Sequence, residues 1–283
     1  MLKNDLKFSN QNNTADGSKR AFVGFAGLNT LWFNTGTLCN LACTGCYIES
    51  SPINDKLLYL DLKDVEYYLN EIQLNNWPCK IIGFTGGEPF MNKDIIEIIE
   101  LCLKKKFEVL VLTNAMQPMQ NKLNALQKLS KYQNLKLRIS LDHFSKYKHE
   151  KIRGEKTWDK ALLGIELLIN NNLKFNIAAR TLNQDENLVR DGFNKLFKLH
   201  NLEINAYDDK DLILFPEMNT QSDTPEITTE CWSILGVDPV NMMCSDSRMI
   251  VKRKEDKLTH VVACTLIPYE DNFSYGNKLK DSN

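Results

Sequence analysis

Directly after the first strand-like run, the chain reads Thr35-Gly-Thr-Leu-Cys39-Asn-Leu-Ala-Cys43-Thr-Gly-Cys46-Tyr47, and this loop carries three of its eight cysteines. Thiolates are the usual ligands of iron–sulfur clusters, and a loop that brings three together can bind three irons of a [4Fe–4S] cluster. One iron then stays without a protein ligand and can bind a small molecule. A zinc site is the alternative, but it usually pairs two CxxC-like units, and no fourth Cys or nearby His follows. The spacing therefore predicts Cys39, Cys43 and Cys46 as cluster ligands.

A second motif ends the next strand-like run, where the chain reads Thr85-Gly86-Gly87-Glu88-Pro89. Paired glycines allow backbone to approach a ligand closely, because they carry no Cβ. Both motifs follow strands, so both are expected at the C-terminal ends of those strands. In parallel sheets and barrels this edge carries the active site.

Strand-like and helix-like segments alternate around these motifs. Short runs rich in β-branched residues predict strands, and longer stretches of helical period lie between them. Six strands and five helices in alternation predict a parallel sheet, and the pattern alone does not distinguish a doubly wound sheet from a barrel. Asp61, Asn92 and Thr157 are predicted as helix N-caps. The predicted strands are Leu31–Thr35, Lys80–Thr85, Val109–Asn114, Lys136–Asp142, Lys174–Thr181 and Asp211–Phe215, and the predicted helices are 61–75, 93–106, 119–132, 157–171 and 185–199.

Composition excludes several classes of protein. The 283 residues carry 35 Lys+Arg against 36 Asp+Glu, so the net charge of −1 gives no general attraction to nucleic acid or to an anionic membrane. No apolar run approaches the roughly 18–20 residues that span a bilayer, and the polar first residues lack a secretory signal. We expect a cytoplasmic protein. Its predicted parts are a disordered or loose lead-in (1–24), a barrel domain (25–218) and a cysteine-containing extension (219–283).

Together the two motifs make residues 25–218 resemble the radical S-adenosylmethionine (SAM) superfamily, whose cysteine loop binds a [4Fe–4S] cluster and whose GGEP motif meets the amino group of SAM. The resemblance implies an α/β fold, a partial (β/α)6 TIM-like barrel with a small C-terminal cysteine-containing β-hairpin extension. It implies an oxygen-sensitive enzyme that cleaves SAM reductively to a 5′-deoxyadenosyl radical, which abstracts hydrogen from a substrate. It also places Gly86, Gly87 and Glu88 at the cofactor.

Further positions match the superfamily in order along the chain. Asn114 stands where relatives carry a TNG-like turn. Ser140, Asp142 and Arg153 lie in a stretch similar to the "SLD…HxxxRG" segment of the sulfatase-maturase and molybdenum-cofactor branches, in which the Ser binds the SAM ribose and the Arg its carboxylate. Solvated loop charges are the alternative for Asp142 and Arg153. Arg suits a carboxylate because its planar guanidinium offers paired donors.

One position departs from the superfamily pattern. Relatives commonly place an aromatic residue just before the third cysteine, where it contacts the adenine. Here that position is Gly45, and Tyr47 follows Cys46. The adenine contact is therefore assigned to Tyr47 or to another strand end.

The remaining cysteines fall into two groups. Cys79 and Cys102 are predicted as small buried apolar residues. The C-terminal three flank a predicted β-hairpin that turns near Glu255–Lys257, in the manner of SPASM or twitch extensions. We expect an auxiliary [4Fe–4S] cluster there, although the spacing matches neither pattern closely, and zinc or unligated cysteines are the alternatives. Its predicted ligands are Cys231, Cys244 and Cys264.

The substrate is not specified by these residues. The C-terminal extension favours a peptide or protein substrate, and a small molecule or nucleotide derivative is the alternative within the same chemistry. A non-catalytic Fe–S electron-transfer or sensor protein is the alternative of another class, although it has no need of the GGEP motif, Ser140 and Arg153. The resemblance also implies a reductant such as a flavodoxin or ferredoxin. No catalytic acid, base or radical-quenching residue is assigned.

Overall fold

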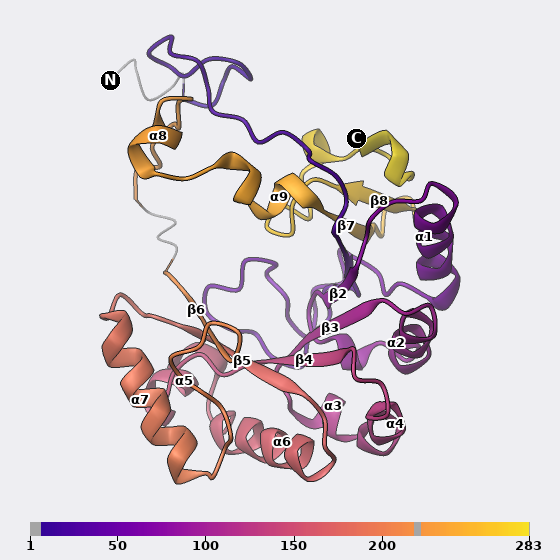
Figure 1. Ribbon diagram of the computed structural model, residues 1–283, viewed down its shortest axis with the longest axis vertical. Helices are drawn as coiled ribbons and strands as arrows, with labels where there is room; N and C mark the ends of the chain where they lie inside the picture. Colours follow the sequence, from indigo (N-terminus) through magenta and orange to yellow (C-terminus); the bar gives the residue numbers. More distant parts are fainter. Residues whose placement is uncertain (1–6, 218–221, 283) are drawn as a thin grey trace.

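The structure, a computed structural model, describes residues 7–217 and 222–282 of the chain. Its strands form one sheet in the order β6-β5-β4-β3-β2-β1-β7-β8 (Figure 1). All neighbouring pairs from β6 to β7 are parallel, and β7 and β8 are antiparallel. The strands are β1 (Thr30–Asn34), β2 (Ile81–Thr85), β3 (Glu108–Thr113), β4 (Leu135–Ser140), β5 (Phe175–Arg180), β6 (Leu212–Phe215), β7 (Ser247–Lys252) and β8 (Thr259–Val262).

All six predicted strands form, with bounds within two residues of the predicted ones. The helix predicted over 119–132 is two short helices, and α5 was not predicted because its only buried side chain is His149, so it has no apolar stripe. The helices are α1 (Leu62–Leu74), α2 (Ile95–Lys104), α3 (Gln117–Gln120), α4 (Leu123–Leu129), α5 (Lys146–Arg153), α6 (Trp158–Asn170), α7 (Glu186–Leu199), α8 (Cys231–Leu235) and α9 (Met243–Asp246).

Helix N-caps are only partly as predicted. Asp61 caps α1 in a reciprocal capping box with Asp64. Thr157 occupies the N-cap of α6 without a side-chain capping bond. The prediction of Asn92 as the N-cap of α2 is wrong, because the cap is Asp94. The Asn92 side chain instead accepts from the Asp94 N–H at 2.9 Å and donates to the Leu60 carbonyl at 2.7 Å.

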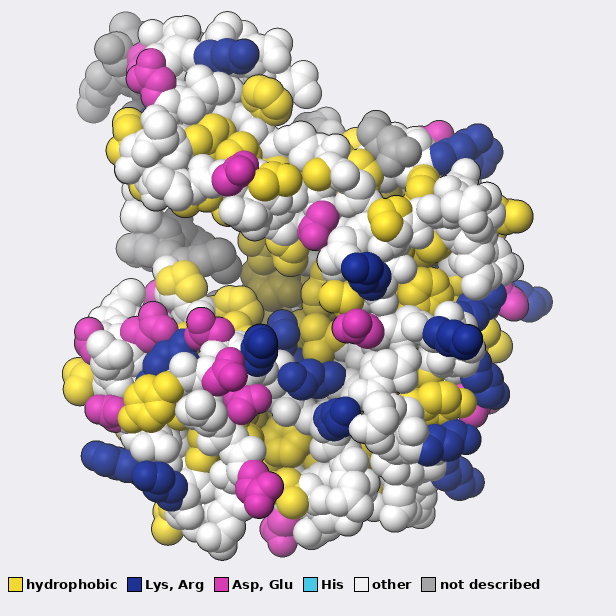
Figure 2. Space-filling model, in the orientation of Figure 1, with side chains coloured by type: hydrophobic (Ala, Val, Ile, Leu, Met, Phe, Trp, Pro, Cys, Tyr) yellow, Lys and Arg dark blue, Asp and Glu magenta, His cyan; other side chains and the backbone are white. Residues whose placement is uncertain are grey.

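The sheet has two different faces. Along β4, Leu135, Leu137 and Ile139 are buried in the core shared with the helices, while the residues between them are partly exposed on the other face. Figure 1 shows α1, α2, α4, α6 and α7 around the outside of the curved sheet. The fold is therefore the expected α/β partial barrel, with a concave inner face. Figure 2 shows a hollow with an apolar depth, and Lys and Arg side chains gather beside it.

The predicted C-terminal hairpin forms, but it also extends the barrel sheet. Lys252 pairs with Thr259 across the turn, as expected. β7 then lies parallel to β1, with Thr30 opposite Ser247. The hairpin covers the edge of β1 that six strands alone leave open, which explains why five of the six β7 residues are buried.

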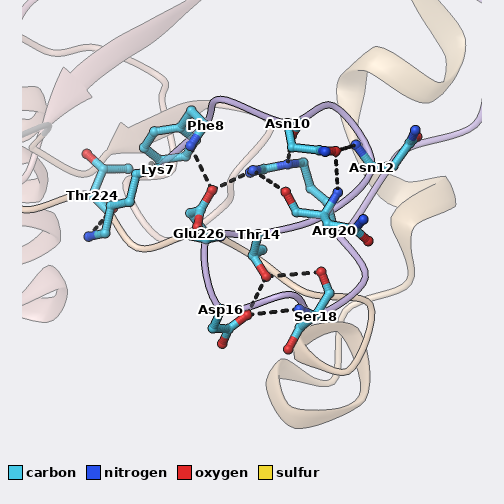
Figure 3. A network of polar contacts seen from close by, with 12 residues as sticks. Lys7, Phe8, Asn10, Asn12, Thr14, Asp16, Ser18, Arg20, Thr224 and Glu226 are labelled. Atoms are coloured by element: carbon cyan, nitrogen blue, oxygen red, sulfur yellow. Dashed lines mark hydrogen bonds and ion pairs between the residues drawn. The ribbon is translucent and has the colours of Figure 1, made fainter. Parts of the chain in front are cut away.

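Residues 7–24, predicted as a loose lead-in, contact the segment that follows β6 (Figure 3). The Glu226 carboxylate accepts from the Phe8 N–H at 2.8 Å and the Ala15 N–H at 2.5 Å, and it pairs with Arg20. Donation from Ala15, then from Phe8, lowers the pKa of Glu226 to about 2. One carboxylate therefore joins two segments that are far apart in the sequence, and residues 1–6 lie outside the described part of the chain.

Within the described residues, none of the helices has the length and apolar character needed to cross a membrane.

Candidate functional site

The cysteine loop leaves the C-terminal end of β1. Cys39 is 7% exposed, and its N–H donates to the Ser51 carbonyl at 3.1 Å. Cys43 and Cys46 are partly exposed, and the Cys46 N–H donates to the Cys43 carbonyl at 3.3 Å. The Thr44 N–H donates to a carbonyl of α5 at 2.8 Å. Backbone hydrogen bonds thus fix the loop on both sides of the cysteines.

The three thiols lie within electrostatic reach of one another. Burial, then the charges of Glu88, Cys43 and Cys46, raises the pKa of Cys39 to about 12. Burial also raises the pKa of Cys43, while the nearby Arg153 lowers it. The Leu41 N–H donates to the Cys39 sulfur at 3.4 Å, a bond that favours the thiolate. Grouped, partly buried thiols of this kind are ionised when a cation binds them, and this supports metal ligation.

No three His, Cys, Asp or Glu residues in the described ranges converge on a point where they could hold a single metal ion. A [4Fe–4S] cluster binds each thiolate through a different iron, so its ligands do not need to meet at one point.

The glycine motif packs directly against the cysteine loop. The Gly87 N–H donates to the Gly36 carbonyl at 2.8 Å, and the Glu88 N–H donates to the Leu38 carbonyl at 3.2 Å. A Cβ at Gly87 would lie 2.1 Å from the Leu38 oxygen, and one at Gly86 would lie 2.5 Å from the Gly36 oxygen. The paired glycines therefore allow this backbone to approach the backbone of the cysteine loop closely.

Glu88 connects this turn to the end of β3. Its buried carboxylate accepts from the Thr113 hydroxyl and the Asn114 N–H, both at 2.8 Å, and from the Phe90 N–H at 3.2 Å. Burial raises the pKa of Glu88 to about 7. The Asn114 side chain donates to Asn40 Oδ1 at 2.9 Å, so a chain of hydrogen bonds runs from β2 through β3 to the cysteine loop.

Arg153 forms a two-armed ion pair with Asp142. Its Nε donates to Asp142 Oδ2 at 2.7 Å and its terminal nitrogen donates to Oδ1 at 3.2 Å. The side chains are 14% and 7% exposed, so they are not solvated loop charges. Because Arg153 also lowers the pKa of Cys43, it lies beside the cysteine loop.

Two further predicted contacts, Ser140 and Tyr47, lie at the same edge of the sheet. Ser140 is the last residue of β4, and its hydroxyl has no hydrogen-bond partner in the part of the chain that the structure describes. Tyr47 is 40% exposed and its hydroxyl lies beside Thr85. Burial raises the pKa of Tyr47, and the charges of Cys46 and Cys264 raise it further, so Tyr47 is within reach of both cysteine groups.

The sequence analysis missed Arg180. It ends β5, pairs with Glu217 through Nε at 2.8 Å, and donates to the Thr44 carbonyl of the cysteine loop at 3.4 Å. The signal that could have found it is a charged residue at a strand end on the same edge as Ser140.

The C-terminal cysteines are only partly together. Burial, then the charge of Cys264, raises the pKa of Cys244, so these two thiols are neighbours. Cys231 begins α8, and its sulfur lies 3.5 Å from the Thr228 hydroxyl. Figure 1 shows α8 apart from α9, the helix that carries Cys244. The structure thus brings two of the three predicted ligands together. Cys102 is fully buried in the core, as predicted, and Cys79 packs against it.

Comparison with known proteins gives the family. The model of the Radical SAM superfamily matches residues 33–186, which is more than half of the chain. The chain belongs to the radical SAM superfamily. It is therefore an enzyme of that superfamily, with a [4Fe–4S] cluster and SAM as its cofactors, as the sequence analysis predicted.

Two relatives each match part of this radical SAM chain. It is 33% identical over 119 residues to the antilisterial bacteriocin subtilosin biosynthesis protein AlbA of Bacillus subtilis (strain 168). This match covers 42% of this chain and 25% of AlbA. It is 31% identical over 160 residues to the molybdenum cofactor biosynthesis protein 1 of Drosophila melanogaster. This match covers 52% of this chain and 26% of that protein. The chain spans about a quarter of the length of these relatives.

The fold of this radical SAM chain is also that of SuiB from Streptococcus suis. The crystal structure of SuiB bound to the precursor peptide SuiA has a TM-score of 0.63 and 14% identity, and the match covers 90% of this chain and 64% of SuiB.

Proposed function

We propose that this radical SAM enzyme modifies a peptide. The observation that carries the proposal is the 33% identity to AlbA, a bacteriocin biosynthesis protein, across 119 residues. The match to SuiB supports it, since that fold accommodates a precursor peptide. The concave face of this chain is also open enough to leave Ser140, Arg138 and Leu112 partly exposed.

Cys39, Cys43 and Cys46 are proposed to hold the [4Fe–4S] cluster. When bound, the cluster and SAM supply reductive cleavage of SAM and a radical that abstracts a substrate hydrogen. The protein's part is to fix the thiolates and to position SAM. Hydrogen bonds from Gly87 and Glu88 to the cysteine loop set the distance between the two motifs.

Arg153 is proposed to bind the SAM carboxylate, with Ser140 at the ribose. Asp142 holds the Arg153 guanidinium at two points, so its orientation is set before SAM binds. Gly86 and Gly87 present backbone, Glu88 and Asn114 keep that turn in place, and Tyr47 supplies the adenine contact. We infer that Arg180 positions the loop through Thr44.

An auxiliary [4Fe–4S] cluster on Cys244, Cys264 and Cys231 is part of the proposal. The neighbouring thiols of Cys244 and Cys264 support two of its ligands. Anaerobic reconstitution followed by iron counting tests it, and about eight irons per chain are expected. A count of about four irons per chain in wild type, with the same count in Cys264→Ala, contradicts the auxiliary cluster.

A second candidate is the same chemistry on a small molecule or nucleotide derivative, which the 31% identity to the molybdenum cofactor protein favours. A non-catalytic Fe–S protein is a third, and it predicts no SAM cleavage at all.

The test is 5′-deoxyadenosine formation by the reconstituted protein with SAM, dithionite and a low-molecular-weight cell extract, with Cys43→Ala as the control. We expect the extract to stimulate formation, and protease treatment of the extract to remove the stimulation. Stimulation that survives the protease favours the small-molecule candidate. A reconstituted cluster with no SAM cleavage under any condition favours the electron-transfer candidate.

A further inference from the structure

The concave face of β4 carries a cation in the barrel interior. Alternation along this strand places Lys136, Arg138 and Ser140 on the face opposite the helix-covered core. Arg138 is half-buried and lies opposite Leu112 of β3 on one side and Asn176 of β5 on the other. It precedes Ser140 by two residues, so it lies deeper in the barrel than the strand ends that carry the cofactor site.

Arg138 is held in place, but no carboxylate among the described residues serves as its counterion. Its Nε donates to Asn176 Oδ1 at 3.2 Å, and this is its one hydrogen bond with the described residues. Asn176 is itself 3% exposed and donates to the Lys210 carbonyl at 3.1 Å, which fixes the orientation of the amide. Burial alone lowers the pKa of Arg138, and no carboxylate within residues 7–217 or 222–282 opposes this effect.

The other arginines show how unusual this is in the described chain. Five of them pair with a carboxylate. Arg248 donates to three backbone carbonyls, and its Cζ lies 3.7 Å from the centroid of the Phe25 ring. Burying a charge without a partner is costly, so an unpaired guanidinium is expected where a ligand supplies the partner. The five ion-paired arginines are Arg20, Arg153, Arg180, Arg190 and Arg253.

We propose that Arg138 binds a carboxylate of the substrate inside the barrel and thereby selects peptides that present a free carboxylate there. This inference rests on the proposed peptide substrate. One guanidinium matches the single charge and planar geometry of a carboxylate. A polyphosphate carries several charges, and the neighbouring surface is apolar, with Leu112 beside the Trp32, Met249 and Val251 cluster. The carboxylate belongs either to an Asp or Glu side chain or to the C-terminus of the peptide.

Affinity selection tests both sources. Reconstituted protein with SAM is incubated with three random nonapeptide libraries, and retained peptides are identified by mass spectrometry. The first library contains Asp and Glu and has an amidated C-terminus, the second lacks both residues and has a free C-terminus, and the third lacks both residues and is amidated. We expect one of the two carboxylate libraries to be retained over the third, and Arg138→Gln to bind its peptides about tenfold more weakly.

Matched variants separate Arg138 from general charge. Lys136→Gln removes a cation from the same face of β4, near the N-terminal end of the strand. This variant is expected to keep the preference for carboxylate-bearing peptides. Arg138→Lys retains the charge and is expected to keep part of the preference for carboxylate-bearing peptides. This variant also allows the test to be made if Arg138→Gln does not fold. Equal retention of all three libraries, or an equal loss in Lys136→Gln, overturns the inference and leaves the peptide proposal standing. Retention of no library by any variant overturns both.

Discussion

The backbone N–H of Asn114 donates a 2.8 Å hydrogen bond to the buried carboxylate of Glu88. The two residues follow the C-terminal ends of neighbouring strands, and Asn114 continues the connection to Asn40 in the cysteine loop. The acid of the GGEP motif therefore acts here as a structural acceptor that ties strand ends to the proposed cluster loop. A carboxylate in this position is costly to ionise, which makes the link sensitive to pH.

Glu88 is expected to lower the free energy of unfolding as the pH rises from about 4.5 to about 7. Its pKa is raised from 4.5 to about 7, so between these values the folded protein keeps a proton that the unfolded chain has released. This destabilises the folded state by about 3 kcal/mol by pH 7. Glu88→Gln removes the dependence. Thermal melts of cluster-free, reduced protein from pH 5 to 8 should show wild type losing melting temperature relative to the variant.

If the melting temperatures of wild type and Glu88→Gln differ by the same amount at every pH from 5 to 8, the raised pKa of Glu88 is contradicted. Glu97→Gln serves as the control, because this acid lies exposed on the first turn of α2. Its melting temperature should follow that of wild type at every pH.

Gly87→Ala is expected to displace the cysteine loop. The added Cβ meets the Leu38 carbonyl oxygen at 2.1 Å, and because this is backbone, the loop itself has to move. Overpacking of this kind costs about 1–3 kcal/mol. Iron content after reconstitution should fall well below that of wild type, together with the melting temperature. Gly24→Ala is the matched control, since nothing lies within 4 Å of its Cβ position, and iron loading that is equal in both variants would count against the steric argument.

The strands and both motifs could be predicted because they are local features of the sequence. β-branched runs give β1 to β6, and the positions of Cys39 and Gly87 after strands place both at one edge of the sheet. The partners of these residues could not be predicted. Arg180 reaches the cysteine loop across 136 positions, and pairing over such distances leaves no periodic signal.

The C-terminal hairpin and the lead-in illustrate two further limits. The hairpin turn was predictable, but the pairing of β7 with β1 depends on which sheet edge is open after folding. Residues 7–24 are polar and have no apolar period, so composition predicts a loose segment. They are held instead by hydrogen bonds to the Glu226 carboxylate and by backbone bonds such as Ala21 N–H to the Ile227 carbonyl, which composition does not reveal.

Asp142 and Arg153 are expected to be strongly coupled. Their side chains are 7% and 14% exposed, so removal of one partner leaves a buried charge and costs about 3–5 kcal/mol. Asp142→Asn, Arg153→Gln and the double variant form a mutant cycle, measured by urea unfolding. The double variant should be less destabilised than the sum of the single variants by about 2 kcal/mol or more. Additive losses would show that the two side chains do not depend on each other.

Glu226→Gln is expected to release the lead-in. The amide removes the charge that pairs with Arg20 and leaves one of the N–H donors of Phe8 and Ala15 without an acceptor. Loss of about 1–2 kcal/mol of local stability raises the population of the opened segment roughly tenfold. Limited trypsin digestion should therefore cleave after Lys19 or Arg20 about ten times faster, while the melting temperature of the barrel stays the same. In Glu230→Gln, whose carboxylate bonds to no described residue, cleavage should keep the wild-type rate, and a similar acceleration there would contradict the role of Glu226.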